Sequence, residues 1–284
     1  MKKISKLCYL IVILTLISTL IGIFYSTEAA RFWVVNIYGE SIELFGDGIY
    51  KYNSILKAAG NKGTDAVMLL VAVFFGIMTY LKDKSNRFKF LQAGALAGLL
   101  YYSACLVFGV TFNRLFPVYV LLFSSCLFAM IGLMSDLIKS DTIVSSATDI
   151  RLKGTSAFLI ICGLSVLVWL EFVIGAIATG EPLSVIEIYT TEPTFVLDLA
   201  IILPVYVGCG LNLLRKNLIA YKLTPVLLTF IVIVGMTVIS QNLFQTSMGI
   251  EIPPKDLITL VLSFVILGMF AVILNFRFQK YIRP

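Results

Sequence analysis

The sequence predicts an all-α fold, an eight-transmembrane-helix bundle with a small β-hairpin-like external loop. Of the 284 residues, 59% are hydrophobic and only 13% are charged, whereas soluble domains average roughly 25% charged residues. The apolar residues also gather in runs of about 20, the length of a helix that crosses the hydrocarbon core of a bilayer. This composition excludes a soluble enzyme, a nucleic-acid-binding domain and a disordered tail. The lipid bilayer is therefore the first predicted partner.

Eight such apolar runs follow one another along the chain. They lie near residues 7–25, 64–81, 90–110, 117–135, 155–177, 194–214, 223–243 and 256–275. Pro204 and Gly208 interrupt the sixth run, which membrane helices tolerate because neighbouring groups satisfy the freed backbone atoms. The first run resembles a signal peptide. Its apolar stretch is too long for one, however, and Glu28 stands where the cleavage motif needs a small residue, so we expect a retained helix.

The distribution of basic residues predicts the orientation. Lys and Arg mark the cytoplasmic loops of membrane proteins. With the N-terminus in the cytoplasm, most of the 22 Lys and Arg residues fall in cytoplasmic connections, and most of the 16 acidic residues fall outside. We therefore expect a bacterial plasma-membrane protein with both termini cytoplasmic and an acidic external face. The net charge of +6 then reflects topology. The basic residues are scattered over short segments, which argues against a nucleic-acid partner.

Several kinds of chemistry are missing from the sequence. Histidine is absent, which excludes a His-ligated haem, a His-based zinc site and a Ser-His or Cys-His nucleophile pair. The five cysteines all fall in predicted helices and form no CxxC pair, so we interpret them as packing residues. No nucleotide-binding or hydrolase motif occurs. We predict no cofactor and no metal.

The longest connection, residues 26–63, is expected to lie outside the membrane. Aromatic and β-branched residues on both sides of Gly46-Asp47-Gly48 predict two short strands and a turn there. The loop is interpreted as an aromatic belt at the membrane surface or as a lid over an outward-facing cavity. Its candidate lid residues are Asp47, Tyr50 and Tyr52.

The second spanning helix is expected to begin late. Asn53 is a candidate cap for a short helix that Gly60 ends, and Thr64 or Asp65 for the spanning helix itself.

The chain is expected to be a single integral membrane domain, residues 1–284, with a weak duplication. Two four-helix halves, residues 1–140 and 150–284, would each hold a long external loop. Both loops carry a Gly-Glu step followed by a second acid, Gly39-Glu40 with Glu43 and Gly180-Glu181 with Glu187. Parallel repeats of this kind occur in transporters.

Polar residues inside or beside the apolar runs are the candidate site, because ionisable side chains in a membrane are costly and rare. Arg114 is the basic residue expected to pair with Glu171 or Asp198 at membrane depth. The alternative is a structural ion pair with interhelical amide hydrogen bonds. The candidate ligand-binding residues are Asn113, Arg114, Glu171, Asp198, Gln241 and Gln245.

Three stretches resemble an uncharacterised family of bacterial polytopic membrane proteins with about eight helices. The stretches are Glu43–Ser54 running on to Gly63–Asp65, Phe112–Phe116, and Tyr189–Asp198 with Pro204. The resemblance implies an integral membrane protein whose motifs lie on the external side, and it supplies no activity or catalytic residue. Asn53 stands where the family pattern has an acid.

The leading functional hypothesis is an outward-facing binding, sensing or accessory membrane protein. Its partners would be a small polar ligand or cation on the external side, and a partner membrane subunit. The alternative is a small transporter or channel for a cation or small polar solute, favoured by the interrupted sixth run. A membrane-embedded enzyme is the third hypothesis, weakened by the missing histidine.

Overall fold

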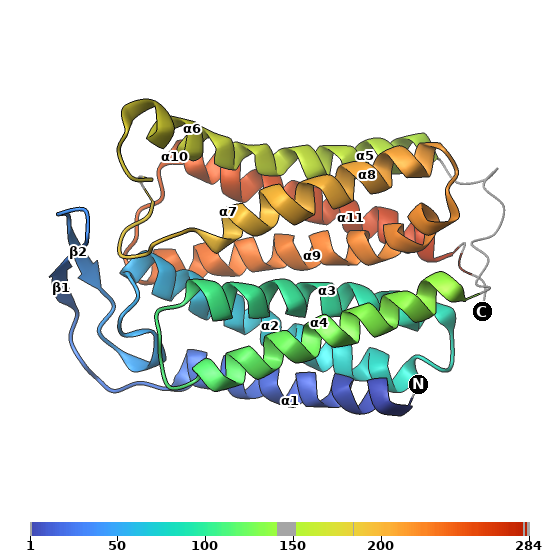
Figure 1. The fold of residues 1–284 in the computed structure, drawn as a ribbon, viewed down its shortest axis with the longest axis horizontal. Helices are drawn as coiled ribbons and strands as arrows, with labels where there is room; N and C mark the ends of the chain where they lie inside the picture. Colours follow the sequence, from blue (N-terminus) through green and yellow to red (C-terminus); the bar gives the residue numbers. More distant parts are fainter. Residues whose placement is uncertain (1, 141–151, 184, 281, 283–284) are drawn as a thin grey trace.

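The chain is a bundle of long helices that lie side by side (Figure 1). The computed structural model describes residues 2–140, 152–183, 185–280 and 282. Within these residues, eight helical segments are long and apolar enough to cross a membrane, from Ile4–Phe24 to Pro254–Gln279. The predicted eight-helix, all-α architecture is confirmed, and the protein is a multi-pass membrane protein by fold class.

The first half of the bundle consists of four continuous helices. They are α1 (Lys2–Phe24), α2 (Ile55–Leu81), α3 (Asn86–Gly109) and α4 (Phe116–Lys139). Each packs against two of the others, α1 on α2 and α4, and α3 on α2 and α4. Their shared core includes Ile11, Phe75, Leu96, Leu99 and Leu122, all fully buried.

The second half consists of four spans, three of which change helix type along their length. The first is α5 (Leu152–Ser165), a 3₁₀ turn η2 (Val166–Val168) and α6 (Trp169–Thr179). The next is α7 (Pro193–Leu197), a π-helix η3 (Asp198–Ile202) and α8 (Leu203–Leu214), followed by the unbroken α9 (Leu218–Ser247). The last is α10 (Pro254–Asp256), a π-helix η4 (Leu257–Leu262) and α11 (Ser263–Gln279).

The π-helix in the sixth span has a local cause. Pro204 has no backbone N–H, and its ring crowds the carbonyl one turn earlier. The helix forms a wider, π-helical turn instead, in which the Leu203 N–H donates to the Asp198 carbonyl five residues earlier. This places Asp198 at the first position of a π segment, a feature that occurs frequently at functional sites.

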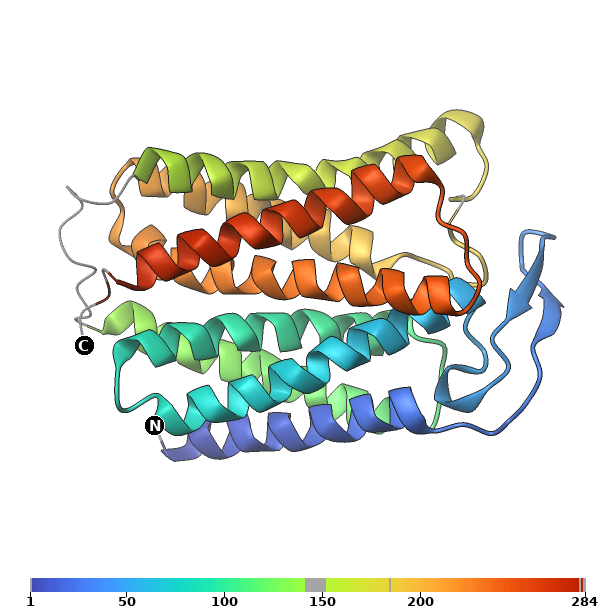
Figure 2. The ribbon, with the colours of Figure 1, turned by 180° about the vertical axis from the view of Figure 1, so that it is seen from behind.

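Helix α9 joins the two halves. It packs on α2 and α3 of the first half and on α8 and α11 of the second, as Figure 2 shows. Gly63 permits the close approach of α2, because a Cβ at this position would lie 2.6 Å from the Cα of Gln241. The expectation of a separate short helix that ends at Gly60 is therefore wrong. Helix α2 runs unbroken from its Ser54 cap, with Thr64 and Asp65 inside it.

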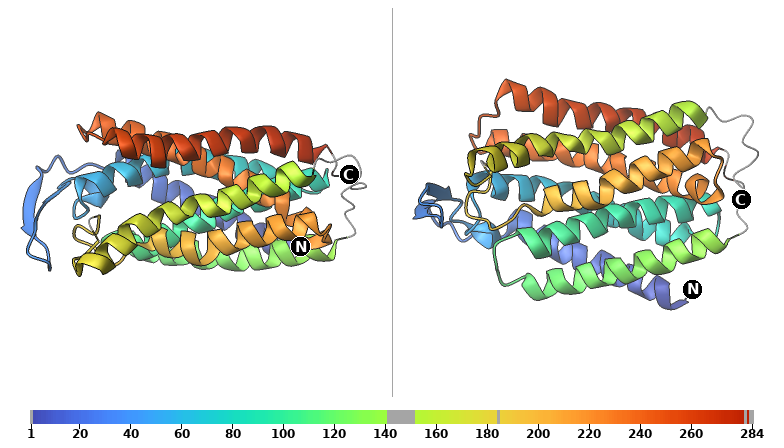
Figure 3. Two further views of the ribbon diagram at one scale, coloured as in Figure 1. Left: turned by 90° about the horizontal axis from the view of Figure 1, so that it is seen from above. Right: turned by 45° about the horizontal axis from the view of Figure 1, so that its top comes forward.

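A two-stranded hairpin projects beyond one end of the helices (Figure 3). Strands β1 (Phe32–Val35) and β2 (Ser41–Leu44) are antiparallel, with Phe32 opposite Leu44. The turn lies at residues 36–40, where Asn36 Oδ1 accepts the backbone N–H groups of Tyr38 and Glu40. The hairpin is thus confirmed, but its predicted turn at Gly46-Asp47-Gly48 is wrong. Residues 48–50 form a 3₁₀ turn, η1.

The two ends of the bundle differ in charge. Residues 25–54, 110–115, 180–183, 185–192 and 248–253 lie in connections at the hairpin end. The opposite end, called the basic end, holds residues 82–85 and 215–217 and the end of α11. Helix α1 begins and α11 ends at this basic end (Figure 1).

Candidate functional site

The predicted pairing of Arg114 with a membrane-depth carboxylate is wrong. Glu171 forms an ion pair with Lys255, and the two side chains are 60% and 66% exposed. The Asp198 carboxylate accepts hydrogen bonds from two neutral side chains. Arg114 is exposed in the α3–α4 connection and forms no ion pair with any residue that the structure describes. Helix α6 turns Glu171 toward α10, so these three groups do not converge.

The predicted amide residues serve local structure. Asn113 accepts from the Leu115 N–H at 2.8 Å and donates to the Thr111 carbonyl, which shapes the α3–α4 turn. Gln241 Nε2 donates to Thr64 Oγ1 at 2.8 Å, which joins α9 to α2. Gln245 lies one turn further along α9 and faces Gly60 of α2. These positions fit the alternative interpretation, interhelical hydrogen bonding.

The three candidate lid residues have different surroundings. Asp47 accepts hydrogen bonds from Ser26 Oγ (2.8 Å) and from the N–H of Thr27 (2.6 Å). Partial desolvation raises the pKa of Asp47, but these hydrogen bonds outweigh it and lower the pKa to about 2. Tyr50 is buried and donates to Asp65. Tyr52 is exposed at the surface, where its ring meets Phe32 edge-on.

A group of polar side chains joins the two halves at the hairpin end. Lys57 at the start of α2 forms an ion pair with Glu192, which is 6% exposed, while Lys57 is 30% exposed. Ser54, the cap of α2, donates to the Glu187 carboxylate. Tyr189 Oη donates to Asn53 Oδ1 at 2.9 Å. We call this group the seam cluster; it comprises Asn53, Ser54, Lys57, Glu187, Tyr189 and Glu192.

The seam cluster holds more negative than positive charge in a partly dry environment. Burial raises the pKa of Glu187, and the hydrogen bond from Ser54 and the charge of Lys57 oppose this rise. Burial also raises the pKa of Tyr189. The Lys57 ammonium lies 5.7 Å from the centre of the Tyr189 ring. The cluster therefore contains two carboxyl groups but one ammonium, which is paired with Glu192, and an excess of carboxyl groups favours a second cation.

A small cavity of about 50 Å³ opens beside the Lys57–Glu192 pair. Its lining also includes Asn61, Tyr189 and Thr194, together with Cys105 of α3. A buried water needs roughly 15–30 Å³. The cavity is therefore large enough for an ammonium-sized group.

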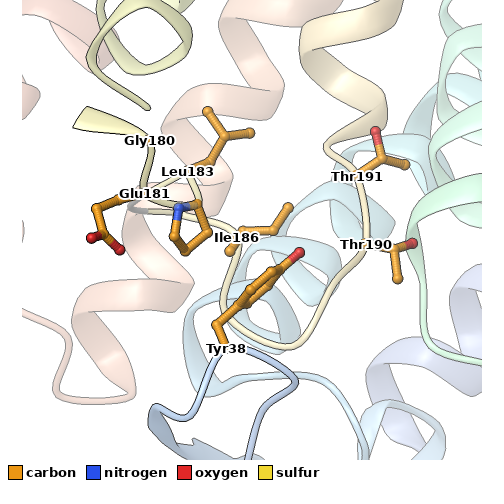
Figure 4. Close-up of a pocket in the computed structure, with 8 residues that line it drawn as sticks. Tyr38, Gly180, Glu181, Leu183, Ile186, Thr190 and Thr191 are labelled. Carbon is orange, nitrogen blue, oxygen red and sulfur yellow. The ribbon is translucent and has the colours of Figure 1, made fainter. Parts of the chain in front are cut away.

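A larger groove of about 460 Å³ lies next to this cavity, between the hairpin and the 180–191 loop. Tyr38 extends from the hairpin toward Ile186, with Glu181 on one side and Thr190 and Thr191 on the other (Figure 4). Leu183 and Pro182 add apolar surface. Thr191 lines both the groove and the cavity. The two spaces are therefore neighbours, one partly apolar and the other charged.

Two buried aspartates lie deeper, on either side of α3. Asp198 accepts from Tyr101 Oη (2.9 Å) and from Trp169 Nε1 (2.7 Å). Asp65 of α2 accepts from Tyr50 Oη (2.7 Å) and Tyr102 Oη (2.6 Å).

Sequence reasoning singled out Asp198 but missed the Asp65 site and most of the seam cluster. Asp65 had a signal, an acid followed directly by an apolar run, which we interpreted as a helix cap. The seam residues lie in connections, and only folding brings Lys57 to Glu192. Within the described residues, no group of three or more Cys, Asp or Glu is placed to hold a metal ion.

Comparisons with family models, with curated proteins and with solved structures give no match. The eight apolar helices define the class of protein, a polytopic helical membrane protein. The resemblance to a bacterial family stays a prediction.

Proposed function

We propose that this protein is an outward-facing binding protein of the membrane, and that its ligand is a small organic cation. The ligand would place an ammonium group in the charged cavity and a partly apolar body in the adjoining groove. The observation that carries the proposal is the seam cluster, in which Lys57 is paired with Glu192 while a second partly buried carboxyl group, Glu187, is hydrogen-bonded to Ser54 and has no ion-pair partner among the described residues. A ligand cation there offsets the excess negative charge at short range.

The groove supports a ligand larger than a bare ion. Tyr38, Leu183 and Ile186 provide aromatic and apolar surface, and the hydroxyls of Thr190 and Thr191 provide polar contacts. Ligand sites commonly combine an apolar lining with a few placed polar groups. Aromatic faces also attract organic cations.

The test is thermal stabilisation of the purified full-length protein in detergent by a panel of small amines. Ethanolamine, a diamine and an aromatic amine probe the head and body separately, and the matched alcohols lack the charge. We expect amines to raise the unfolding temperature and alcohols to leave it unchanged. Glu192→Gln should weaken the response about tenfold in concentration or more, a loss of about 1.4 kcal/mol.

Glu171→Gln is the matched control, since Glu171 is also ion-paired at the hairpin end but lies outside the seam cluster. Equal responses to amines and alcohols, or equal responses of the two variants, would refute the proposal.

We also infer that the hairpin end faces outward across a bacterial plasma membrane. Basic residues flank the helices at the opposite end, including Lys82, Lys84, Arg215 and Lys216, as expected for the cytoplasmic side. Labelling of the single-cysteine variants Tyr52→Cys and Lys84→Cys with an impermeant thiol reagent in whole cells tests this, and labelling of Tyr52→Cys alone is expected. To isolate the signal, the native cysteines are first replaced by serine. Labelling of the variant at residue 84 alone would show that the basic end faces outward, and would refute the inferred orientation.

A second candidate function, transport of the same class of ligand, rests on the sixth span. Its π-helix and Pro204 interrupt the regular hydrogen bonding directly at Asp198, and interrupted helices often build transport sites. Uptake of a radiolabelled amine by proteoliposomes separates the two functions. Binding without uptake supports the binding protein, and uptake that Asp198→Asn abolishes supports transport.

A further inference from the structure

Helix α3 presents two adjacent tyrosines to two buried aspartates in opposite halves of the bundle. Tyr102 donates to Asp65 of the first half, and Tyr101 donates to Asp198 of the second. Consecutive residues of an α-helix point about 100° apart, since a turn holds 3.6 residues. Two consecutive side chains of α3 therefore reach carboxyl groups on two different sides of the helix. Each carboxyl group receives a second hydrogen bond from its own half, from Tyr50 and from Trp169 respectively.

The surroundings of Asp65 contain little to neutralise a negative charge. The side chain is 0% exposed, and Tyr50, Tyr102 and Tyr119 face it from η1, α3 and α4. Helix α1 contributes Gly22, which has no side chain. The nearest cation is Lys62, one turn earlier on α2, whose ammonium donates to the Ile23 carbonyl instead. Among the described residues no cation lies within ion-pair distance of Asp65.

The surroundings of Asp198 are similar. The side chain is 7% exposed, and it faces Tyr101 and Cys105 of α3, Trp169 of α6 and Tyr206 of α8. The other charged groups on the side of the cavity residue Cys105 are Glu192 and Lys57, which form an ion pair with each other. No described cation pairs with Asp198.

An ionised carboxylate in such a site is costly. Burial of a charge without an opposite charge costs several kcal/mol, and buried groups usually become neutral instead. A bound proton also satisfies the geometry around Asp65. In the protonated state the acid O–H would donate to Tyr50, reversing the hydrogen bond of the carboxylate, and Tyr50 would donate in turn to Tyr119. The Tyr119 hydroxyl is buried and lies near both Tyr50 and Asn113.

We propose that Asp65 and Asp198 are two proton-binding sites on opposite sides of α3, each of which binds and releases a proton near neutral pH. Release of either proton leaves a carboxylate and transfers H⁺ to water. The hydrogen-bond donors of the two sites, Tyr101 and Tyr102, are consecutive residues of α3. The inference does not depend on the solute proposed above, because it concerns the protein without ligand.

Infrared difference spectroscopy of the full-length protein tests this directly. A protonated carboxyl group has a carbonyl stretch that a carboxylate lacks. We expect wild-type protein at pH 7 to show this band, and Asp65→Asn and Asp198→Asn each to remove a part of it. Glu171→Gln is the control and should leave the band unchanged, because Glu171 is exposed and paired with Lys255.

Two further variants keep the test decisive if an asparagine variant does not fold. Tyr102→Phe and Tyr101→Phe keep both acids and remove one hydrogen bond from Asp65 and from Asp198 respectively. Each should shift the frequency of its own part of the band. A wild-type spectrum without the band at pH 7, or a band that none of the four variants alters, would overturn the proposal.

Discussion

Replacement of Gly22 by alanine tests how α1 packs on α2. A Cβ at Gly22 would lie 1.9 Å from Asp65 Oδ2 and 3.0 Å from Tyr50 Oη. Both distances are shorter than an ordinary van der Waals contact. The methyl group must therefore displace the Asp65 carboxyl group from Tyr50, or push α1 away from α2.

The expected cost follows from these two effects. Forcing an extra methyl into a packed core costs about 1–3 kcal/mol. Leaving a buried hydrogen-bonding group unsatisfied costs about 1–3 kcal/mol. The higher helix propensity of alanine returns up to about 1 kcal/mol. We expect Gly22→Ala to lower the free energy of unfolding by about 2–3 kcal/mol.

Gly76→Ala is the matched control in the same interface. Gly76 of α2 faces Val12 of α1, and its added Cβ would lie 3.5 Å from Val12 Cγ2, an ordinary contact. This variant should be neutral or stabilised by up to about 1 kcal/mol. Unfolding in detergent, followed by circular dichroism against denaturant, measures both variants.

The Asp65→Ala background identifies the cause. It removes the carboxyl group that the new methyl meets, so Gly22→Ala should cost little there. A double-mutant cycle measures this coupling. The reasoning is refuted if Gly22→Ala is as stable as Gly76→Ala, or if its cost is the same with and without the Asp65 side chain.

Three further predictions concern the hairpin end. Glu192→Gln leaves the half-buried Lys57 ammonium without its ion-pair partner and should cost about 1–2 kcal/mol. Glu171→Gln breaks an exposed ion pair and should stay within about 0.5 kcal/mol. Denaturant unfolding of the two variants checks this, and equal values would contradict it. The lowered pKa of Asp47, about 2 when folded and about 3.9 when unfolded, stabilises the fold above pH about 4, and this stability is lost as the pH falls toward 2. Asp47→Asn should lack that part of the acid-induced loss, and an unchanged pH profile would count against the hydrogen-bond network. Tyr189→Phe removes a partly buried hydrogen bond and should cost about 1 kcal/mol, whereas Tyr52→Phe changes an exposed ring and should have no measurable effect in the same unfolding assay.

The helices were predictable because each one is a local pattern. A span needs only about 20 apolar residues in sequence, and all eight predicted runs correspond to helical segments. The start of α2 was not predictable in the same way. Residues 55–63 are more polar than the span and contain Gly60 and Gly63, which disfavour a helix in isolation. They are helical because α9 packs closely on this side, where a side chain would not fit at Gly63.

The hairpin illustrates the same limit on a smaller scale. Its composition indicated strands, but two glycine-containing segments, at residues 39 and 46–48, competed for the turn. Asn36 stabilises the turn at residues 36–40, because its Oδ1 accepts hydrogen bonds from two backbone N–H groups of the turn. Its Nδ2 also donates to the Glu187 carbonyl at 2.7 Å. That last partner lies in the other half of the chain, beyond the reach of a local pattern.

The sequence by itself determined the class of protein, the eight spans and the asymmetry of charge between the two ends, because hydrophobic length and charge placement are properties of consecutive residues. The tertiary structure alone decided which polar groups meet. Arg114 and Glu171 were plausible partners by depth, yet α6 turns Glu171 toward Lys255. Lys57 meets Glu192 across the seam. Pairing at membrane depth depends on how each helix is rotated about its axis, and packing against all its neighbours sets that rotation.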